Sequence, residues 1–235
     1  DSAKPRFVYS DKAETYQDGQ FLNKRQHYYD KARQGGSYQY GNLTEAREFD
    51  CVGGTCPTEP VRTSYSQFYP ANTANSSGGG VYIVNKPGKQ WLYKVREGAT
   101  GAALVSESRN YYDQTSSYTT APTQGLLRRK EMLATAGTAV GVTYEYYANG
   151  NLQRTADQGG HETRTYYDSR YQVFPVCVKN HLGQMSRTTY YGAPGSSDAN
   201  CSTSNGPAAA DGRFGLVYGT RDANDAITTA SYDQW

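Results

Sequence analysis

Two histidines and two aspartates in the C-terminal half are the residues best suited by type to do chemistry. His161 and His181 each lie in or beside an expected turn, so stacked repeats would bring both imidazoles to one edge, where they could bind a metal ion. With Asp157 the same histidines could form an acid-base site, and Asp157 with Asp168 could form a carboxylate pair. Their positions in turns explain all four residues without chemistry. We therefore predict no enzyme activity, no metal site and no cofactor.

Four cysteines fall into two pairs. Cys51 and Cys56 flank a Gly-Gly centre that lets the chain fold back, and Cys177 and Cys201 bracket one repeat with its polar insertion. Metal ligation would need a second close pair or nearby histidines, and the C-x-x-C redox motif is absent. Disulfides are favoured over free thiols, which indicates an oxidising compartment.

The composition predicts a sheet that is held together by tyrosine. The chain has 23 Tyr and 25 Gly but only 6 Phe, 2 Trp and 2 Met, with a mean hydropathy of -0.82. Tyrosine can replace Leu, Ile and Val because its ring packs on a pleated surface while its hydroxyl stays wet or hydrogen-bonded. Cross-strand aromatic pairs should then supply much of the stability.

Charge and hydropathy argue against two classes of partner. The net charge is +2 with nearly balanced signs, so no clustered basic face points to nucleic acid. No apolar run approaches the ~18 residues of a membrane span. The N-terminus is polar and carries no signal peptide, so either a signal was removed or the chain is a segment of a longer polypeptide.

A repeated pattern organises the C-terminal part: a tyrosine-rich strand ends in an acidic or Asn-Gly turn, and another strand follows. Such a period is typical of repeat architectures, in which each unit buries its apolar face against its neighbours. Asn149-Gly150 predicts a type I′ hairpin turn, with positive φ at both residues. The predicted strands are 142–147, 152–156, 161–167, 173–179, 184–191, 214–220 and 226–232.

The N-terminal part repeats less cleanly, and its expected strands are 21–30, 43–50, 61–69, 81–84, 90–95 and 104–113. Residues 71–80 are a flexible connector, and 124–134 fits a helix or a strand equally well. The expected organisation is all-β: degenerate repeats over 1–140, then clearer repeats over 141–235 with an inserted loop at 192–212. The whole is one continuous array of antiparallel hairpins.

Tyrosine followed by aspartate recurs at strand ends, and these motifs resemble the YD-repeat family of bacterial Rhs proteins, insecticidal toxin-complex B/C subunits and animal teneurins. The resemblance runs from about residue 20 to the end and is strongest over 142–192. One departure is that Tyr191 is followed by Gly192 and an insertion. The motif residues are Tyr29, Asp30, Tyr112, Asp113, Tyr147, Gly150, Tyr167, Asp168, Tyr191, Tyr232 and Asp233.

The resemblance implies a β-spiral in which hairpins wind side by side into the wall of a hollow shell. In this family the shell commonly encloses a toxic C-terminal domain, which this chain lacks. The expected role is therefore structural, in a secreted or cell-surface protein. Its partners would be further copies, through exposed edge strands, or the rest of a larger YD-repeat protein. The alternative is a module that binds carbohydrate or a cell-surface partner through the tyrosine-rich face.

Overall fold

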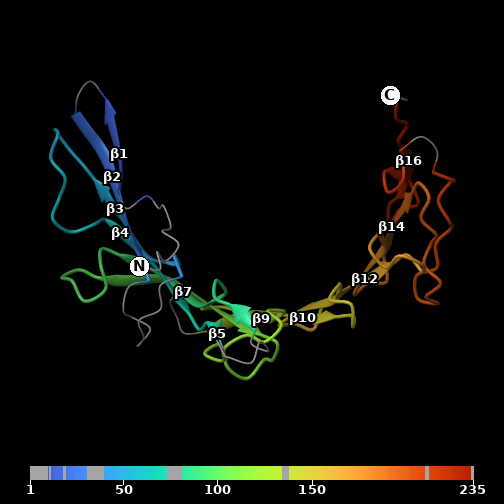
Figure 1. Ribbon diagram of the computed structural model, residues 1–235, viewed down its shortest axis with the longest axis horizontal. Helices are drawn as coiled ribbons and strands as arrows, with labels where there is room; N and C mark the ends of the chain where they lie inside the picture. The colour runs from blue at the N-terminus through green and yellow to red at the C-terminus, as the bar shows by residue number, and fades with distance from the viewer. Residues whose placement is uncertain are drawn as a thin grey trace, which may run out of the picture. The chain divides into compact units, whose positions relative to one another are not determined.

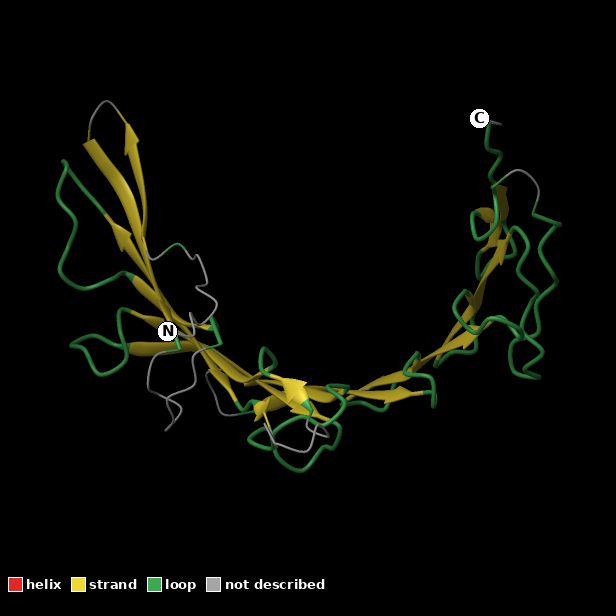
Figure 2. Ribbon diagram, in the orientation of Figure 1, coloured by secondary structure: helices red, strands yellow, loops and turns green. Residues whose placement is uncertain are grey.

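The computed structural model describes residues 10, 12–17, 20–30, 40–72, 81–133, 138–209 and 212–233. Every regular element among these residues is a β-strand, and none of them is helical (Figure 2). The all-β prediction is confirmed. None of the described residues forms a helix long and apolar enough to span a membrane.

Contacts divide the chain into two compact units, Asp1–Gly141 and Val142–Trp235. The boundary falls within one strand, β10. The strands that begin in the first unit are β1 (Lys12–Gln17), β2 (Gln20–Tyr29), β3 (Leu43–Asp50), β4 (Arg62–Phe68), β5 (Ala71–Asn72), β6 (Tyr82–Ile83), β7 (Pro87–Lys94), β8 (Ala103–Tyr112), β9 (Leu127–Leu133) and β10 (Ala139–Tyr146). The second unit continues with β11 (Leu152–Asp157), β12 (Glu162–Tyr167), β13 (Pro175–Asn180), β14 (Met185–Tyr190), β15 (Val217–Arg221) and β16 (Ile227–Thr229).

Fourteen strands form one open antiparallel sheet, and they follow one another in chain order (Figure 1). The structure bears on three sequence expectations. Residues 71–72 of the expected connector 71–80 form the short strand β5, and residues 73–80 lie outside the described residues. Residues 81–84 do not join the sheet, because β6 pairs only with β5 in a separate two-stranded ribbon. The segment 124–134, which fits a helix or a strand from its sequence, contributes strand β9. It pairs with β8 over six β8 residues, from Glu107 to Tyr112.

Eight strand pairs share a register slip that falls immediately before an aromatic residue. Each of these aromatics is the last or second-last residue of its strand. In each pair the extra residue lies on the next strand of the sheet, opposite the end of the strand that carries the aromatic, so it is the next strand that bulges and bends near its start. The aromatic residues are Tyr16, Tyr29, Phe68, Tyr93, Tyr112, Tyr146, Tyr167 and Tyr190.

The tight turns of the second unit share one geometry, which corrects the type I′ prediction. In the Asn149-Gly150 turn only the glycine has a positive φ. The fourth residue of each turn donates its N–H to the carbonyl of the first and lies in the left-handed region. These donors are Gly150, Gly160, Gly183 and Asp225, with φ of 87°, 80°, 81° and 66°.

In the first unit, the buried residues form a row across adjacent strands. Glu45 on β3, Tyr65 on β4, Trp91 on β7 and Glu107 on β8 lie directly opposite one another in register. All four are buried, and the Tyr65 and Trp91 rings stack with centroids 5.3 Å apart. A row of cross-strand pairs therefore takes the place of a second packed layer.

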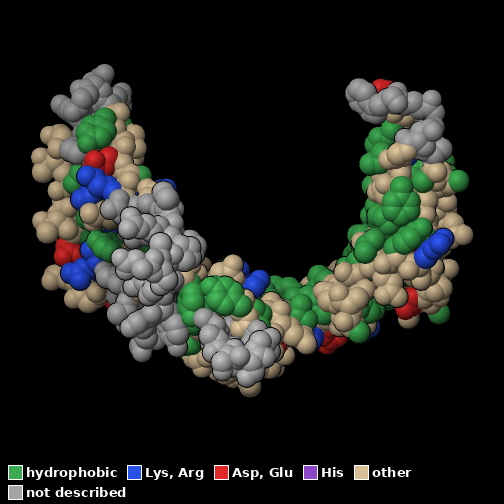
Figure 3. Space-filling model, viewed as in Figure 1, with side chains coloured by type: hydrophobic (Ala, Val, Ile, Leu, Met, Phe, Trp, Pro, Cys, Tyr) green, Lys and Arg blue, Asp and Glu red, His purple; other side chains and the backbone are tan. Residues whose placement is uncertain are grey.

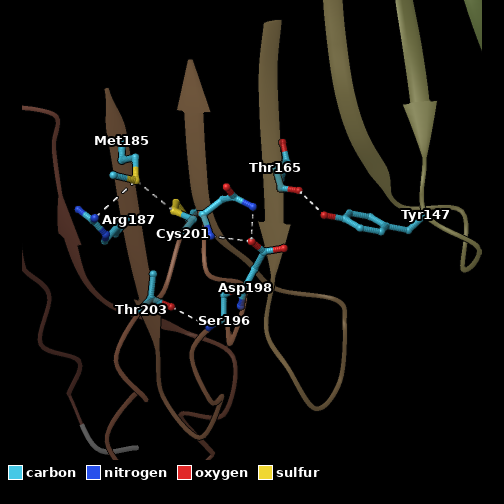
Figure 4. The surroundings of a disulfide bond; sticks show 10 residues. Tyr147, Thr165, Met185, Arg187, Ser196, Asp198, Cys201 and Thr203 are labelled. Atoms are coloured by element: carbon cyan, nitrogen blue, oxygen red, sulfur yellow. Dashed lines mark hydrogen bonds between the residues drawn. A yellow bond between two sulfur atoms is a disulfide. The ribbon is translucent and has the colours of Figure 1, made fainter. Parts of the chain in front are cut away.

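The second unit has a smaller buried cluster, made of Tyr166, Cys177 and Cys201, against which Met185 packs. Tyr166 and Cys177 are register partners on β12 and β13. Cys201 comes from the long loop between β14 and β15, so its disulfide to Cys177 brings that loop onto the sheet (Figure 4).

The turn geometry predicts opposite effects for two substitutions. Gly183→Ala should lower the free energy of unfolding by about 1 kcal/mol, because an L-residue is strained at positive φ. A β-carbon at Gly183 meets no atom within 4 Å, so crowding adds nothing. Asp225→Gly should raise the free energy of unfolding by roughly 0.5 kcal/mol, because relief of strain exceeds the entropy cost of glycine. Urea unfolding measures both, and a neutral Gly183→Ala would contradict the assigned turn.

Candidate functional site: the tyrosine and aspartate loops

Three of the predicted Tyr-Asp pairs occupy equivalent positions, with the tyrosine as the last residue of a strand and the aspartate directly after it. Asp30 follows β2, Asp113 follows β8, and Asp168 follows β12. When the strands of an antiparallel sheet follow one another in chain order, successive connections lie alternately at the two opposite ends of the strands. We call these two rows of connections the two edges of a unit. Within the first unit, Asp30 and Asp113 therefore lie on the same edge, and in the second unit Asp168 shares an edge with Tyr147 and Tyr191.

The aspartate side chains close these loops by accepting backbone N–H groups. Asp113 accepts four: from Thr123 (2.6 Å), Gln124 (3.0 Å) and Gly125 (3.2 Å) on one oxygen, and from Leu126 (2.9 Å) on the other. One carboxylate thus satisfies four consecutive donors of a loop that has no other regular structure to pair with.

Asp30 and Asp168 close their loops in the same way. Asp30 accepts from Gly41 (2.6 Å) and Asn42 (3.1 Å). Asp168 is 1% exposed and accepts from Tyr171 (2.5 Å), Val173 (3.0 Å) and Phe174 (3.0 Å). The aspartate of the motif is therefore a structural residue that organises the loop.

Hydrogen bonding favours the ionised form of two of these carboxylates, Asp113 and Asp168. Burial tends to raise the pKa of Asp113 and of Asp168, but the backbone N–H donors outweigh it and hold each pKa below its usual range. Such a group stabilises the fold above its unfolded pKa of about 4, and the contribution is lost as the pH falls through the lower folded pKa.

Asp168→Asn should lower the free energy of unfolding at pH 7 by about 2 kcal/mol, because charge-assisted bonds to buried N–H groups are lost. The difference from the wild type should shrink as the pH falls below about 4, because the carboxylate is protonated first in the unfolded chain and, at lower pH, in the folded protein as well. Urea unfolding at several pH values measures this. Asp50→Asn is the matched control, since Asp50 is exposed. Equal effects of the two variants would show that Asp168 has no special role.

The other motif residues use different contacts. At Tyr191, where the motif has glycine in place of aspartate, the inserted loop closes through the backbone: Tyr191 donates to Leu216 (2.9 Å) and Gly192 to Pro207 (2.7 Å). Tyr232 donates its hydroxyl to the Val217 carbonyl (2.9 Å), and Asp233 follows it outside any strand.

A cleft of about 270 Å³ lies at the edge of the second unit that carries Tyr147 and Asp168. Tyr147, Tyr166 and Tyr167 line one part of it, and Ser196 and Asp198 of the inserted loop line another. Burial raises the pKa of both Tyr147 and Tyr166, and the nearby Asp198 carboxylate raises each of them further. The lining offers hydroxyl, carboxamide and carboxylate groups, which suit a hydrogen-bonding ligand.

The sequence did not single out Asp198 or Ser196. The only signal near them was Cys201, whose disulfide fixes the segment. Asp198 accepts the Cys201 N–H through its backbone carbonyl at 3.0 Å, and Ser196 accepts the Asp198 N–H through its hydroxyl at 3.1 Å. Figure 4 shows Tyr147 reaching across to Thr165 of β12, to whose carbonyl it donates at 3.1 Å.

Both predicted disulfides are present. The Cα atoms are 4.1 Å apart in Cys51–Cys56 and 6.3 Å apart in Cys177–Cys201, and all four cysteines are used. Persistent disulfides are typical of proteins in oxidising surroundings.

The two histidines and two aspartates that are suited by type to chemistry divide between the two edges of the second unit. Asp168 lies at the same edge as Tyr147 and Tyr191, which we call the tyrosine edge. His161 and His181 meet at the opposite edge, with ring centroids 4.4 Å apart, and His161 Nδ1 lies 2.9 Å from the Asp157 carboxylate. Asp157 and Asp168 therefore do not form a carboxylate pair.

Comparison with known proteins gives no family. No protein-family model matches the chain, and no curated protein sequence matches it.

Proposed function

We propose that the chain is a structural segment of a secreted or cell-surface protein of the YD-repeat type, and that its sheet forms part of a wall. The observation that carries the proposal is the strict chain order of fourteen antiparallel strands. A sheet built in this way can be extended by adding hairpins without changing those already present. The resemblance of the motifs and the two disulfides are consistent with an extracellular wall of this kind.

The use of the tyrosines supports a structural role over carbohydrate binding. Tyr112 and Tyr190 donate their hydroxyls to the first carbonyl of the preceding strand, Pro87 and Pro175, at 3.3 Å each. Tyr147 donates to Thr165 in a similar way. Hydroxyls that hold neighbouring strands together are less available to a sugar, so packing explains these side chains better.

The second unit also presents aromatic surface that a larger assembly could cover. Phe174 and Phe214 pack with ring centroids 5.6 Å apart, and Tyr171 packs on Phe214 at 5.2 Å. Phe214 remains 49% exposed and Tyr171 39% exposed. Figure 3 shows hydrophobic side chains gathered on the visible face of this unit. Grouped exposed aromatics of this kind are typical of contact surfaces.

The last strand of the sheet supplies a second contact. Thr228 of β16 pairs with Thr220 of β15. A backbone hydrogen bond joins the two chain segments on each side of this pair: the Asp222 N–H donates to the Ala226 carbonyl, and the Ala230 N–H donates to the Tyr218 carbonyl. The polar backbone groups of Ile227 and Thr229 therefore point away from β15. Among the described residues β16 pairs with no other strand, so this edge can accept another strand.

Thr229→Pro should prevent association through this edge and leave the pairing with β15 intact, because proline removes only an outward N–H. Sedimentation velocity over a range of concentrations should show the wild type and Thr229→Val forming larger species. Thr229→Pro should stay at the monomer mass of 25.9 kDa. Circular dichroism confirms that the variants fold. A wild type that is monomeric at every concentration would argue against edge pairing, as would unchanged association of Thr229→Pro.

A further inference from the structure

Two turns of the second unit bring a pair of imidazoles together. The turn between β11 and β12 carries His161, and the turn between β13 and β14 carries His181. Both connections lie on the edge opposite the tyrosines, since one full hairpin separates them. Their ring centroids are 4.4 Å apart with an angle of 46° between the planes, and both residues are exposed.

The His161 ring is held from two further sides. Asp157 binds the His161 backbone N–H through one carboxylate oxygen and Nδ1 through the other, each at 2.9 Å. The ring also lies against Gly159, where a β-carbon would come within 3.1 Å of Cε1 and 3.2 Å of Nδ1. With Nδ1 engaged by the carboxylate, Nε2 is the ring nitrogen left to bind a ligand.

A carboxylate on the second nitrogen is the usual support of a histidine that ligates a metal, because it fixes the tautomer and makes the other nitrogen more basic. Imidazole is a preferred ligand of divalent zinc, copper and nickel. Although the sequence alone predicts no metal site, the proximity of the two rings leads us to propose that His161 and His181 together bind one first-row transition-metal ion through their ring nitrogens. Asp157 is the positioning residue, and water completes the coordination.

The surroundings define what kind of site this is. Among the described residues no group of three or more His, Cys, Asp or Glu side chains is placed so that it could hold a metal ion, so the ion would be held by the two imidazoles alone and remain accessible. Arg164 and Lys179 line the groove that contains His181, but Glu162 pairs with Arg164 at 3.0 Å and reduces the local positive charge. The site is therefore open and lies on the surface, so a bound ion could exchange with solvent.

Calorimetric titration of the untagged, oxidised protein with Zn²⁺ tests the proposal. The wild type should bind one ion, and both His161→Ala and His181→Ala should lose at least about tenfold in affinity. His27→Ala is the matched control. His27 is the chain's other histidine, lies in the first unit and has Nδ1 3.0 Å from the Ser10 carbonyl oxygen. Absence of zinc binding by the wild type would overturn the proposal, as would undiminished binding by either variant.

Asp157→Asn tests the positioning role. Affinity for Zn²⁺ should fall about 10- to 100-fold, as it does when the outer partner of a metal-binding histidine is lost. The ¹⁵N chemical shifts of the His161 ring, which report the tautomer, should change in the metal-free variant. Circular dichroism should not change, because the carboxamide oxygen of the variant can still accept the His161 backbone N–H. Unchanged ring shifts together with unchanged affinity would remove Asp157 from the site.

Discussion

Everything in this structure depends on how a single sheet buries side chains without a second layer to pack against. The first unit solves this with a row in which Glu45, Tyr65, Trp91 and Glu107 face one another across four strands. Arg47 binds Glu45 at 2.6 Å, and Lys89 and Arg109 bind Glu107 at 3.0 and 2.7 Å. Burial tends to raise the pKa of Glu107, but these two cations outweigh it and hold the pKa below its usual range. Buried carboxylates are tolerated here because each is paired within the same face.

The loops at the tyrosine edge follow from the same constraint. A long loop beside an open sheet has few backbone partners, and one aspartate at the strand end supplies acceptors for several of its N–H groups. Where the aspartate is missing, after Tyr191, the much longer insertion needs a disulfide to hold it against the sheet.

The sequence predicted most of the strands because tyrosine alternation and turn residues act locally, within one hairpin. It failed where a distant contact decides the outcome. Residues 81–84 have a strand's composition but pair with β5 outside the main sheet, and 124–134 contributes a strand that lies between β8 and β10. The Tyr-Asp motif indicated the loop positions but not the N–H groups that bind each carboxylate. The proximity of Asp198 to Tyr147 and Tyr166 depends on the fold of the insertion, which no local pattern encodes.

The central claim is that each strand of the sheet is stabilised only by the strands beside it in the sheet and by their connecting loops. Hydrogen exchange with mass spectrometry on Arg164→Pro tests this directly, because proline at this position of β12 removes the backbone N–H that faces Lys179 of β13. The account predicts faster exchange in β11, β12 and β13, with wild-type protection retained in β2, β3 and β4. Equal loss of protection in both sets of strands would contradict it, because it would show one cooperative core shared by the whole chain.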